Sequence, residues 1–220
     1  EFAQYKGLWV DGTLNAAGAL ANPITFTGTT EQNGWWRGIQ MWNTGSATLE
    51  HVVVAYSGYY ESVGVLKSGS GALVLRNSTV RNTSGDGLRI AAGSSSFTSA
   101  NNTFATNNYG VRVGVNVSFE DDSSQFSGNN IDVFLDGGTI TQAVTWGLKP
   151  TYSLYVSGDV TVGAGGALTI RPNTVVKFAQ YKGLVVDGTL SAVGTAAAPI
   201  TFTDWRDDTV GGDANHDASV

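Results

Sequence analysis

The chain has 220 residues, a formal net charge of −6, 29 glycines, 4 prolines and no cysteine. The lack of cysteine excludes a disulfide framework and a thiolate metal site. No basic patch is present to attract a phosphate backbone, so we expect no nucleic-acid partner. No apolar run reaches the length of a membrane-spanning helix, and the abundance of glycine, valine, threonine and serine favours short strands joined by tight turns.

The first element, residues 2–27, occurs twice. FAQYKGLWVDGTLNAAGALANPITFT returns at residues 178–203 as FAQYKGLVVDGTLSAVGTAAAPITFT, without a gap and with 20 of 26 positions identical. We call residues 2–27 the first copy and residues 178–203 the second copy. A repeat of this length predicts that the chain, residues 1–220, is one solenoid domain and a fragment of a longer repetitive array.

Aromatic residues cluster after the first copy. Flat rings on a polar surface suit the apolar faces of sugars, so they predict a carbohydrate-binding surface. The alternative is that Trp35 or Trp36 caps the interior and that the tyrosines are ordinary surface residues. The six candidates are Trp35, Trp36, Trp42, Tyr56, Tyr59 and Tyr60.

A shorter repeat runs through the middle of the chain. Gly64-Val-Leu-Lys, Gly87-Leu-Arg-Ile and Gly110-Val-Arg-Val begin at equal intervals, and Asn130-Ile-Asp-Val follows at a slightly shorter one. A second series of short alternating strands lies between them. A repeat of about 20 to 26 residues that contains two or three strands fits one turn of a parallel β-helix. The sequence therefore predicts an all-β fold of about eight to ten such turns.

Stacking in register predicts which residues share a column from one turn to the next. Phe97 should stack on Phe119, and Phe104 on Phe126. The remaining columns are Ile39, Val65, Leu88, Val111 and Ile131 facing inward; Gln40, Leu66, Arg89, Arg112 and Asp132 facing solvent; and a polar ladder of His51, Asn77, Asn101 and Ser123 at a turn.

Ionisable groups concentrate near residues 120–132. A glycoside hydrolase needs two carboxyl groups about 5 to 10 Å apart, and a lyase would need acidic calcium ligands with a Lys or Arg base. The alternative is a surface ladder of charges without catalysis, because alternation sends neighbouring residues to opposite faces. The candidates are Glu120, Asp121, Asp122, Arg89, Arg112 and Asp132.

The segment Gly158–Phe178, together with Asn77 and Asn101, resembles the right-handed parallel β-helix repeats of the pectate-lyase-like superfamily. The resemblance is greatest to repeats of large bacterial secreted and surface proteins. It implies a right-handed solenoid and a secreted or cell-surface location, with any signal peptide outside this chain. It does not imply one activity, because the same fold serves lyases, hydrolases and adhesins.

The segment 204–220 is acidic and begins a loop or an insertion. Oxygen-bearing residues at alternate positions resemble the first half of a calcium-binding loop, because this spacing lets three side chains converge on one hard cation. Ala218 replaces the turn glycine of such loops, and a solvated acidic loop is the alternative. The candidate calcium ligands are Asp213, Asn215, Asp217 and Ser219, with additional charge from Asp207 and Asp208.

Taken together, the sequence predicts a structural and binding segment of a bacterial extracellular repeat protein, a stalk or adhesin-like element that contacts a polysaccharide or a cell-surface glycan. The rival hypothesis is a polysaccharide-degrading enzyme, either a lyase or a glycoside hydrolase. Because an uncapped solenoid exposes strand edges at its ends, we also expect end-to-end self-association.

Overall fold

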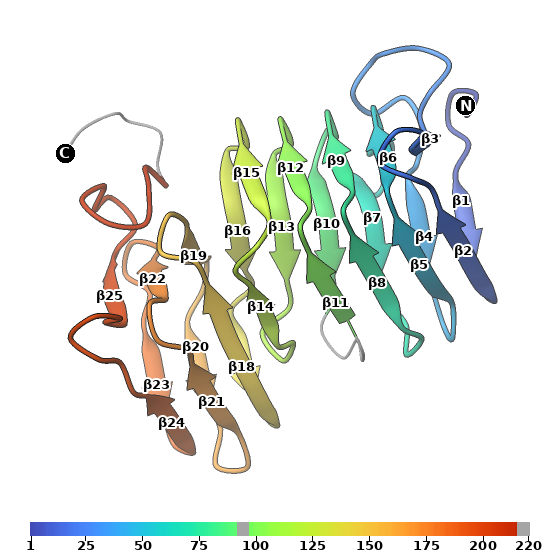
Figure 1. Cartoon of the computed structure of the whole chain (residues 1–220). Helices are drawn as coiled ribbons and strands as arrows, with labels where there is room; N and C mark the ends of the chain where they lie inside the picture. Colours follow the sequence, from blue (N-terminus) through green and yellow to red (C-terminus); the bar gives the residue numbers. More distant parts are fainter. Residues whose placement is uncertain (92–96, 215–220) are drawn as a thin grey trace. The chain divides into compact units, whose positions relative to one another are not determined.

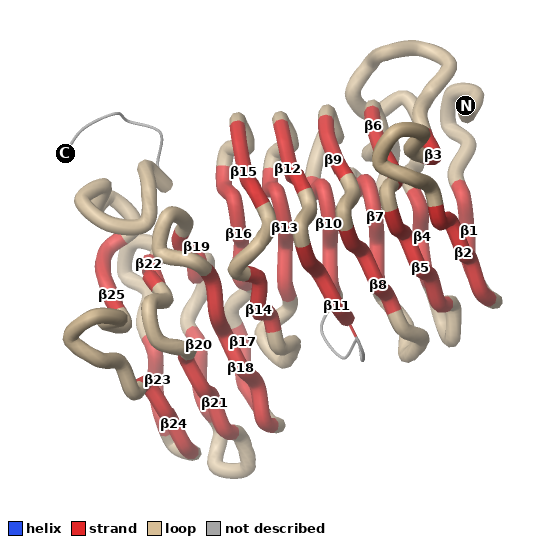
Figure 2. The backbone as a smooth tube through the Cα atoms, viewed as in Figure 1, coloured by secondary structure: helices blue, strands red, loops and turns tan. Residues whose placement is uncertain are grey.

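The computed structural model describes residues 1–91 and 97–214. In these residues the chain consists of short strands and turns, as Figure 2 shows, and includes no helix that could cross a membrane. The strand pairings described for these residues are parallel, for example Leu8 with Ile39 and Val160 with Leu184. The expected all-β parallel solenoid is therefore confirmed.

The chain divides into two compact units, and the first comprises residues 1–112 and 123–130. Its strands form three parallel sheets, in which each strand pairs with its counterpart one coil away (Figure 1). From β1 to β13 the chain makes four turns. The strands are β1 (Leu8–Val10), β2 (Thr13–Ala17), β3 (Ile24–Phe26), β4 (Ile39–Met41), β5 (Ser46–Glu50), β6 (Val52–Ala55), β7 (Val63–Lys67), β8 (Leu73–Arg76), β9 (Thr79–Arg81), β10 (Asp86–Ile90), β11 (Phe97–Ala100), β12 (Thr103–Ala105), β13 (Tyr109–Val113) and β15 (Gln125–Ser127).

The second unit comprises residues 113–122 and 131–220 and also has three parallel sheets. From β16 to β25 it makes three turns, so the two units together have about seven. The strands are β14 (Phe119–Asp121), β16 (Ile131–Leu135), β17 (Gly138–Ile140), β18 (Ala143–Leu148), β19 (Ser153–Val156), β20 (Val160–Val162), β21 (Ala167–Ile170), β22 (Val175–Phe178), β23 (Leu184–Val186), β24 (Thr189–Ala192) and β25 (Thr201–Asp204).

Counted within the two units the turns number about seven, and the step from β13 to β16 brings the count from β1 to β25 to eight, at the lower end of the expected eight to ten. The first turn is longer than the predicted repeat. It extends from Leu8 to its partner Ile39, and the next turn, from Ile39 to its partner Val65, contains fewer residues. A long segment between β3 and β4 takes up the difference. Loops of this kind lie on the surface of a solenoid and can grow without changing the stacking of the strands.

The predicted inward column is present in the first unit. Ile39 pairs with Val65 and Val65 with Leu88, and all three side chains are buried. Val111 is buried as well. Ile131 is only half-buried because it begins its strand. The buried residue of that strand that pairs with Leu154 lies two positions later, at Val133.

The outward column differs from the prediction. Gln40 and Leu66 were expected to face solvent, but their side chains are only 2% and 3% exposed. The Gln40 amide donates a hydrogen bond to the Arg37 carbonyl oxygen over 3.1 Å, so the segment before β4 folds against this face. The long first turn thus covers a surface that a minimal coil would leave open.

One of the two predicted aromatic stacks is confirmed. The ring centroids of Phe104 and Phe126 lie 5.4 Å apart with an interplanar angle of 19°. Phe97 pairs in register with Leu73 in the first unit, and Phe119 with Trp146 in the second. The stacking of Phe97 on Phe119 stays a prediction.

The predicted polar ladder is present in part, because the Asn101 N–H donates to Ser123 Oγ over 2.8 Å. His51, Asn77 and Asn101 occupy equivalent corners with φ between 47° and 54°, in the left-handed region. Such a corner is tolerated best by glycine and asparagine. The buried hydrogen bonds run through the next residue of each corner, because the Ser78 N–H donates to Asn102 Oδ1 over 3.1 Å. Ser124 continues the ladder by accepting from the Asn102 N–H over 3.0 Å.

The two copies of the repeat form terminal strands of their sheets. Among the residues that the structure describes, β1, β2 and β3 pair only with the coil that follows them. Within the same residues, β23, β24 and β25 pair only with the coil that precedes them. The same repeated sequence therefore pairs through one edge in the first copy and through the opposite edge in the second copy.

Candidate functional site

An aromatic cluster surrounds the guanidinium group of Arg37 on the first unit. Its Cζ lies 5.0 Å from the ring centroid of Tyr60 and 5.8 Å from those of Tyr59 and Trp9. Tyr5 packs on Tyr59 with ring centroids 4.3 Å apart, and Arg37 Nε donates a hydrogen bond to the Tyr5 carbonyl oxygen over 3.1 Å. We call these five residues the aromatic platform.

Three segments that are distant in sequence build the platform: the start of the first copy, the long segment 28–38, and the turn 56–62. The Arg37 N–H donates to the Lys6 carbonyl oxygen over 2.7 Å, which holds the first two segments together. Gly7 makes this approach possible, since a Cβ at that position would lie 2.8 Å from the Cβ of Arg37. The cluster is thus fixed by backbone contacts as well as by its rings.

Much of the platform faces solvent. Tyr60 is 75% exposed, Trp9 50% and Tyr5 49%. A cation over aromatic faces is attracted by the negative potential of each ring, and the attraction holds the rings and the guanidinium together. The result is a set of apolar ring surfaces with hydrogen-bond donors between them.

Tyr59 and Tyr60 are the only two of the six predicted aromatic residues in the platform. The placement of Trp36 on a binding surface is wrong, because this side chain is fully buried. Its ring stacks on Phe2 with centroids 4.3 Å apart, and its Nε1 donates to the Ala55 carbonyl oxygen over 2.8 Å. For Trp36 the alternative, a residue that closes the interior, is the correct one.

The other three predicted aromatics make separate contacts. Trp35 Nε1 donates to a threonine hydroxyl over 3.1 Å, Trp42 Nε1 donates to the Gln40 side chain over 3.3 Å, and the Arg81 guanidinium lies 5.5 Å from the Tyr56 ring. The sequence prediction missed Tyr5 and Trp9. A signal was available for Trp9, because it is one of the six positions at which the two copies differ.

The predicted acidic cluster is organised around an arginine that the sequence prediction did not include. Arg171 follows β21 in the second unit, and its Nη2 lies 2.6 Å from Asp122 Oδ2. Its Nε lies 3.5 Å from Glu120 Oε2. One guanidinium therefore binds both exposed carboxylates. A substrate bond placed between these carboxylates would have to displace it.

Two other members of the cluster, Asp121 and Arg89, lie elsewhere or make a different ion pair. Asp121 alternates to the opposite side of its strand and is buried. Arg89 forms an ion pair with Asp86, three residues earlier on the same strand. Arg112 belongs to the first unit and Asp132 to the second. The described structure brings Glu120 and Asp122 together through Arg171, and catalysis by the cluster stays a prediction.

The predicted calcium site lies mostly outside the described residues, which include Asp213 but not Asn215, Asp217 or Ser219. Among residues 1–91 and 97–214, no group of three or more acidic, histidine or cysteine side chains is arranged to hold a metal ion. Asp207 is engaged within the loop, because Thr203 and Thr209 donate hydrogen bonds to its carboxylate and thereby lower its pKa. Calcium binding stays a prediction.

The acidic loop after β25 covers a lysine. The Lys177 side chain is fully buried, and its Nζ donates to the Gly212 carbonyl oxygen over 2.5 Å. Burial lowers the pKa of Lys177, and the carboxylates of Asp208, Asp207 and Asp213 oppose this shift. The loop is therefore held against β22 by a hydrogen bond from a buried lysine side chain.

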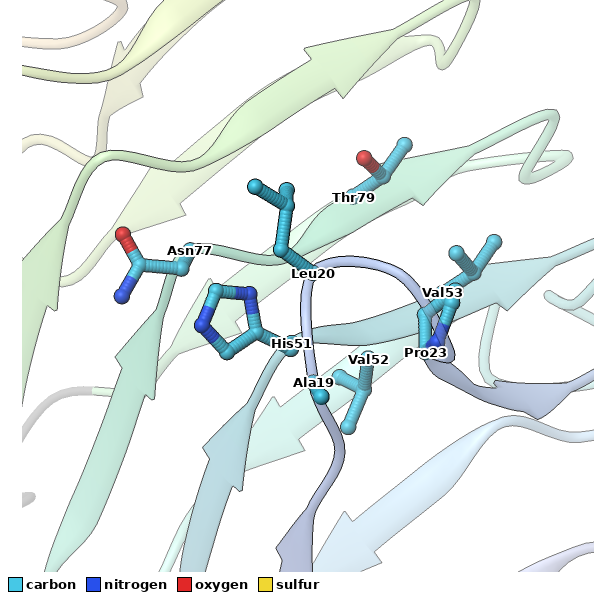
Figure 3. Close-up of a pocket in the computed structure, with 8 residues that line it drawn as sticks. All are labelled: Ala19, Leu20, Pro23, His51, Val52, Val53, Asn77 and Thr79. Carbon is cyan, nitrogen blue, oxygen red and sulfur yellow. The ribbon is translucent and has the colours of Figure 1, made fainter.

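A small hollow lies beside the corner at His51. Figure 3 shows Leu20 between His51 and Asn77 on one side and Val53 and Pro23 on the other. Its volume of about 150 Å³ is below that of ordinary small-molecule sites, which measure about 300 to 1,000 Å³. The hollow is therefore a weaker candidate than the platform.

The sequence was compared with protein families, with curated proteins and with solved structures. The profile described as "Right handed beta helix region" matches residues 5–131 and 37–188. The chain belongs to this family. The right-handed parallel β-helix predicted from the resemblance is confirmed. Neither the curated proteins nor the solved structures contain a match to this β-helix. Family membership fixes the fold, and the function has to come from the sites on it.

Proposed function

We propose that this β-helix is a structural and binding segment of a bacterial extracellular protein, at the cell surface or secreted, and that it contacts carbohydrate through the aromatic platform. The observation that carries the proposal is the arrangement of Arg37 among Tyr5, Trp9, Tyr59 and Tyr60. Three of these rings are exposed by about half or more.

The chemistry of the platform suits a sugar. Ring faces stack on the apolar C–H faces of pyranose rings, while hydroxyl groups at the sugar rim need hydrogen-bond partners. A guanidinium carries five N–H donors, so its bond to the Tyr5 carbonyl oxygen leaves donors for those hydroxyls. The phenol groups of Tyr59 and Tyr60 add donors and acceptors at the edge.

A role as a polysaccharide lyase or glycoside hydrolase is the alternative. It would rest on Glu120 and Asp122, which Arg171 binds together. A glycosidase needs its two carboxyl groups on either side of a glycosidic bond. Repetition of a whole coil also supports a scaffold, because copies add reach and valency to a binding protein.

The test is retention of the chain on a panel of immobilised polysaccharides, with the eluate analysed for released or unsaturated sugars. Removing one stacking ring should cost about 1 to 2 kcal/mol, so Trp9→Ala and Tyr60→Ala should each weaken retention about 5- to 30-fold. Tyr181→Ala is the matched control. Tyr181 stands in the second copy where Tyr5 stands in the first, and it has Val185 in place of Trp9.

Retention that depends on Trp9 and Tyr60, but not on Tyr181, would support the proposal. Retention that neither substitution weakens would overturn it, as would a lack of retention on every polysaccharide. Release of sugars that Glu120→Gln or Asp122→Asn abolishes would replace it with the enzymatic alternative.

A further inference from the structure

A groove runs along the corners that precede β10, β13 and β16, in the middle of the chain. Its volume of about 320 Å³ lies within the range of ordinary small-molecule sites, about 300 to 1,000 Å³. All the residues that line it belong to the first unit. We call it the corner groove, and the residues at its surface are Asn33, Ser84, Thr106, Asn108, Gly128 and Asn130.

The lining of the corner groove is polar and uncharged. Each described residue that lines it is an asparagine, a serine, a threonine or a glycine. Amide and hydroxyl side chains both donate and accept hydrogen bonds. The groove therefore suits a ligand that carries many neutral groups of the same dual kind, and it offers no charge to pair with a carboxylate or a phosphate.

Two asparagine side chains in the groove have unused hydrogen-bonding groups. Asn108 Oδ1 accepts a hydrogen bond from Asn130 Nδ2 over 2.8 Å, which fixes the orientation of the Asn108 amide. Within the described part of the chain, Asn108 Nδ2 donates no hydrogen bond, and the exposed Asn33 amide makes none. These N–H groups are therefore available to a ligand.

The floor of the groove is held rigidly by buried side chains. Asn107 is 5% exposed, and its Nδ2 donates to Asn129 Oδ1 over 3.1 Å. Gly87 leaves room for this amide, since a Cβ there would lie 2.9 Å from Asn107 Nδ2. The buried hydroxyl groups of Thr83 and Ser57 share a hydrogen bond over 3.2 Å. A ligand would thus bind to a preformed surface, without the entropic cost of ordering it.

The backbone N–H groups of these corners are already used. The Ser84 N–H donates to the Ser57 carbonyl oxygen over 3.1 Å, and the Asn108 N–H donates to that of Gly85 over 2.9 Å. An extended peptide that adds to a sheet is bound chiefly through such backbone groups. A ligand of the corner groove has to be recognised by side chains instead, which favours a hydroxyl-rich molecule over a peptide.

Thr106 has an unusual backbone conformation at the surface of the groove. Its φ is 53°, and the residues at the equivalent corners are Asn82 and Gly128, with φ of 55° and 63°. Glycine and asparagine tolerate this left-handed region, whereas a β-branched residue is an outlier there. Such strained residues are concentrated at functional sites. The Thr106 hydroxyl donates to Asn82 Oδ1 and lines the groove, so the side chain itself accounts for a threonine at this corner.

We propose that the corner groove is a second binding site, which takes a neutral linear saccharide. Hydroxyl groups of the sugar pair with the Asn108 amide and the Thr106 hydroxyl. Successive coils are about 4.8 Å apart, so a saccharide along the groove meets the equivalent residues Ser84, Asn108 and Asn130 in turn. The groove shares no residue with the aromatic platform, and the proposal does not rest on that platform.

The test is an NMR titration of the ¹⁵N-labelled chain with cellohexaose, laminarihexaose and β-1,4-mannohexaose, and with hexagalacturonate as the acidic counterpart. At least one neutral hexasaccharide should shift the side-chain amide signals of Asn33 and Asn108 to saturation. Hexagalacturonate should not shift them. The affinity for the neutral saccharide should be the same at low and high salt, because no charge in the groove is there to be screened.

Two variants separate binding from folding. Asn108→Asp keeps the acceptor for Asn130 but removes the two N–H donors, so it should weaken binding about 3- to 10-fold. Thr106→Gly removes the groove hydroxyl and relieves the left-handed strain. It should weaken binding without lowering the melting temperature. The matched control is Thr48→Ala, at an exposed position in β5 on another sheet, which should change neither quantity.

Three results would overturn the proposal. The first is that no neutral hexasaccharide shifts the Asn33 and Asn108 signals. The second is that hexagalacturonate binds the groove as tightly as the best neutral saccharide. The third is that Asn108→Asp binds as tightly as wild type. Trp9→Ala, in the aromatic platform, should leave these shifts unchanged, so the groove and the platform can fail separately.

Discussion

Buried asparagines join successive coils of the first unit through single side chains. Asn107 is 5% exposed, and its Oδ1 accepts a hydrogen bond from the Thr83 N–H over 3.1 Å. Its Nδ2 donates to the Val80 carbonyl oxygen over 3.1 Å. Its own N–H donates to Asn129 Oδ1 over 3.0 Å. The side chain thus forms hydrogen bonds with backbone groups at a corner that have no partner within the sheets.

Replacing Asn107 with alanine should therefore leave a buried donor at Thr83 and a buried acceptor at Val80. Because each unsatisfied buried group costs about 1 to 3 kcal/mol, we expect Asn107→Ala to lower the free energy of unfolding by about 2 to 4 kcal/mol. Urea denaturation measures the change. The control Asn130→Ala, at an exposed position, should change it by less than about 0.5 kcal/mol. Equal losses in the two variants would contradict this account.

Lys67 provides a pH-dependent test. Its side chain is fully buried, its Nζ donates to the Gly69 carbonyl oxygen, and burial lowers its pKa. Between this lowered pKa and the unfolded value of about 10.4 the unfolded chain binds more protons, so stability should rise with pH. Lys67→Met should flatten the rise in melting temperature between about pH 7 and 10, and Lys177, whose pKa burial also lowers, should keep part of it.

The control for that measurement is Lys6→Met, at an exposed position. It should leave the pH profile of stability unchanged, because this side chain is exposed to solvent in the folded chain as it is in the unfolded chain. A Lys67→Met variant with the wild-type slope would show that burial of this lysine does not set the pH dependence.

Sequence reasoning had limited access to single side chains in turns. Phe104 and Phe126 were predicted to stack because each lies on a strand, where alternation fixes the direction of the side chain. Trp36 and Tyr60 lie outside the strands, where no such rule applies, and one is buried while the other is exposed. Arg171 was missed because it meets Asp122 only after two coils, 49 residues along the chain.

The chain changes direction between strands at corner residues. His51, Asn77 and Asn101 have φ values of 47°, 49° and 54°, and each follows directly on the second strand of its coil. The sequence placed these residues in one column correctly. It did not single out the next residue of each corner, such as Ser78, whose N–H and side chain are buried and make hydrogen bonds between coils.

The left-handed corner at Asn77 predicts that glycine destabilises the protein less than valine does at this position. Glycine adopts the left-handed region freely and asparagine tolerates it, whereas other L-residues are destabilised by about 1 to 2 kcal/mol there. Asn77→Gly should therefore leave the free energy of unfolding nearly unchanged, and Asn77→Val should lower it by about 1 to 2 kcal/mol. Thermal unfolding measures both. Thr98→Val, at an exposed position in β11, is the control and should be neutral, since strands favour valine. Equal stability of the two Asn77 variants would contradict the corner.

Across the whole chain, the spacing of the short repeats predicted the fold, because the stacking of coils depends on this spacing alone. Ile39, Val65 and Leu88 fall one coil apart and meet as expected. Loop length cannot be read from this spacing, so the long first turn was not predicted. The platform was only half predicted for a related reason. Tyr5 and Trp9 reach Arg37 across a long first turn, whose course follows from packing and not from periodicity.

The paired edges of the two copies also matter at the level of the gene. A crossover between the DNA segments that encode residues 2–27 and 178–203 would add or remove one whole repeat unit. In the longer product the shared coil would follow β20 to β22 and precede β4 to β6, and both neighbours are ones that the sequence already pairs with here. Unequal recombination between these segments would therefore place the shared coil only beside neighbours that its sequence already pairs with here.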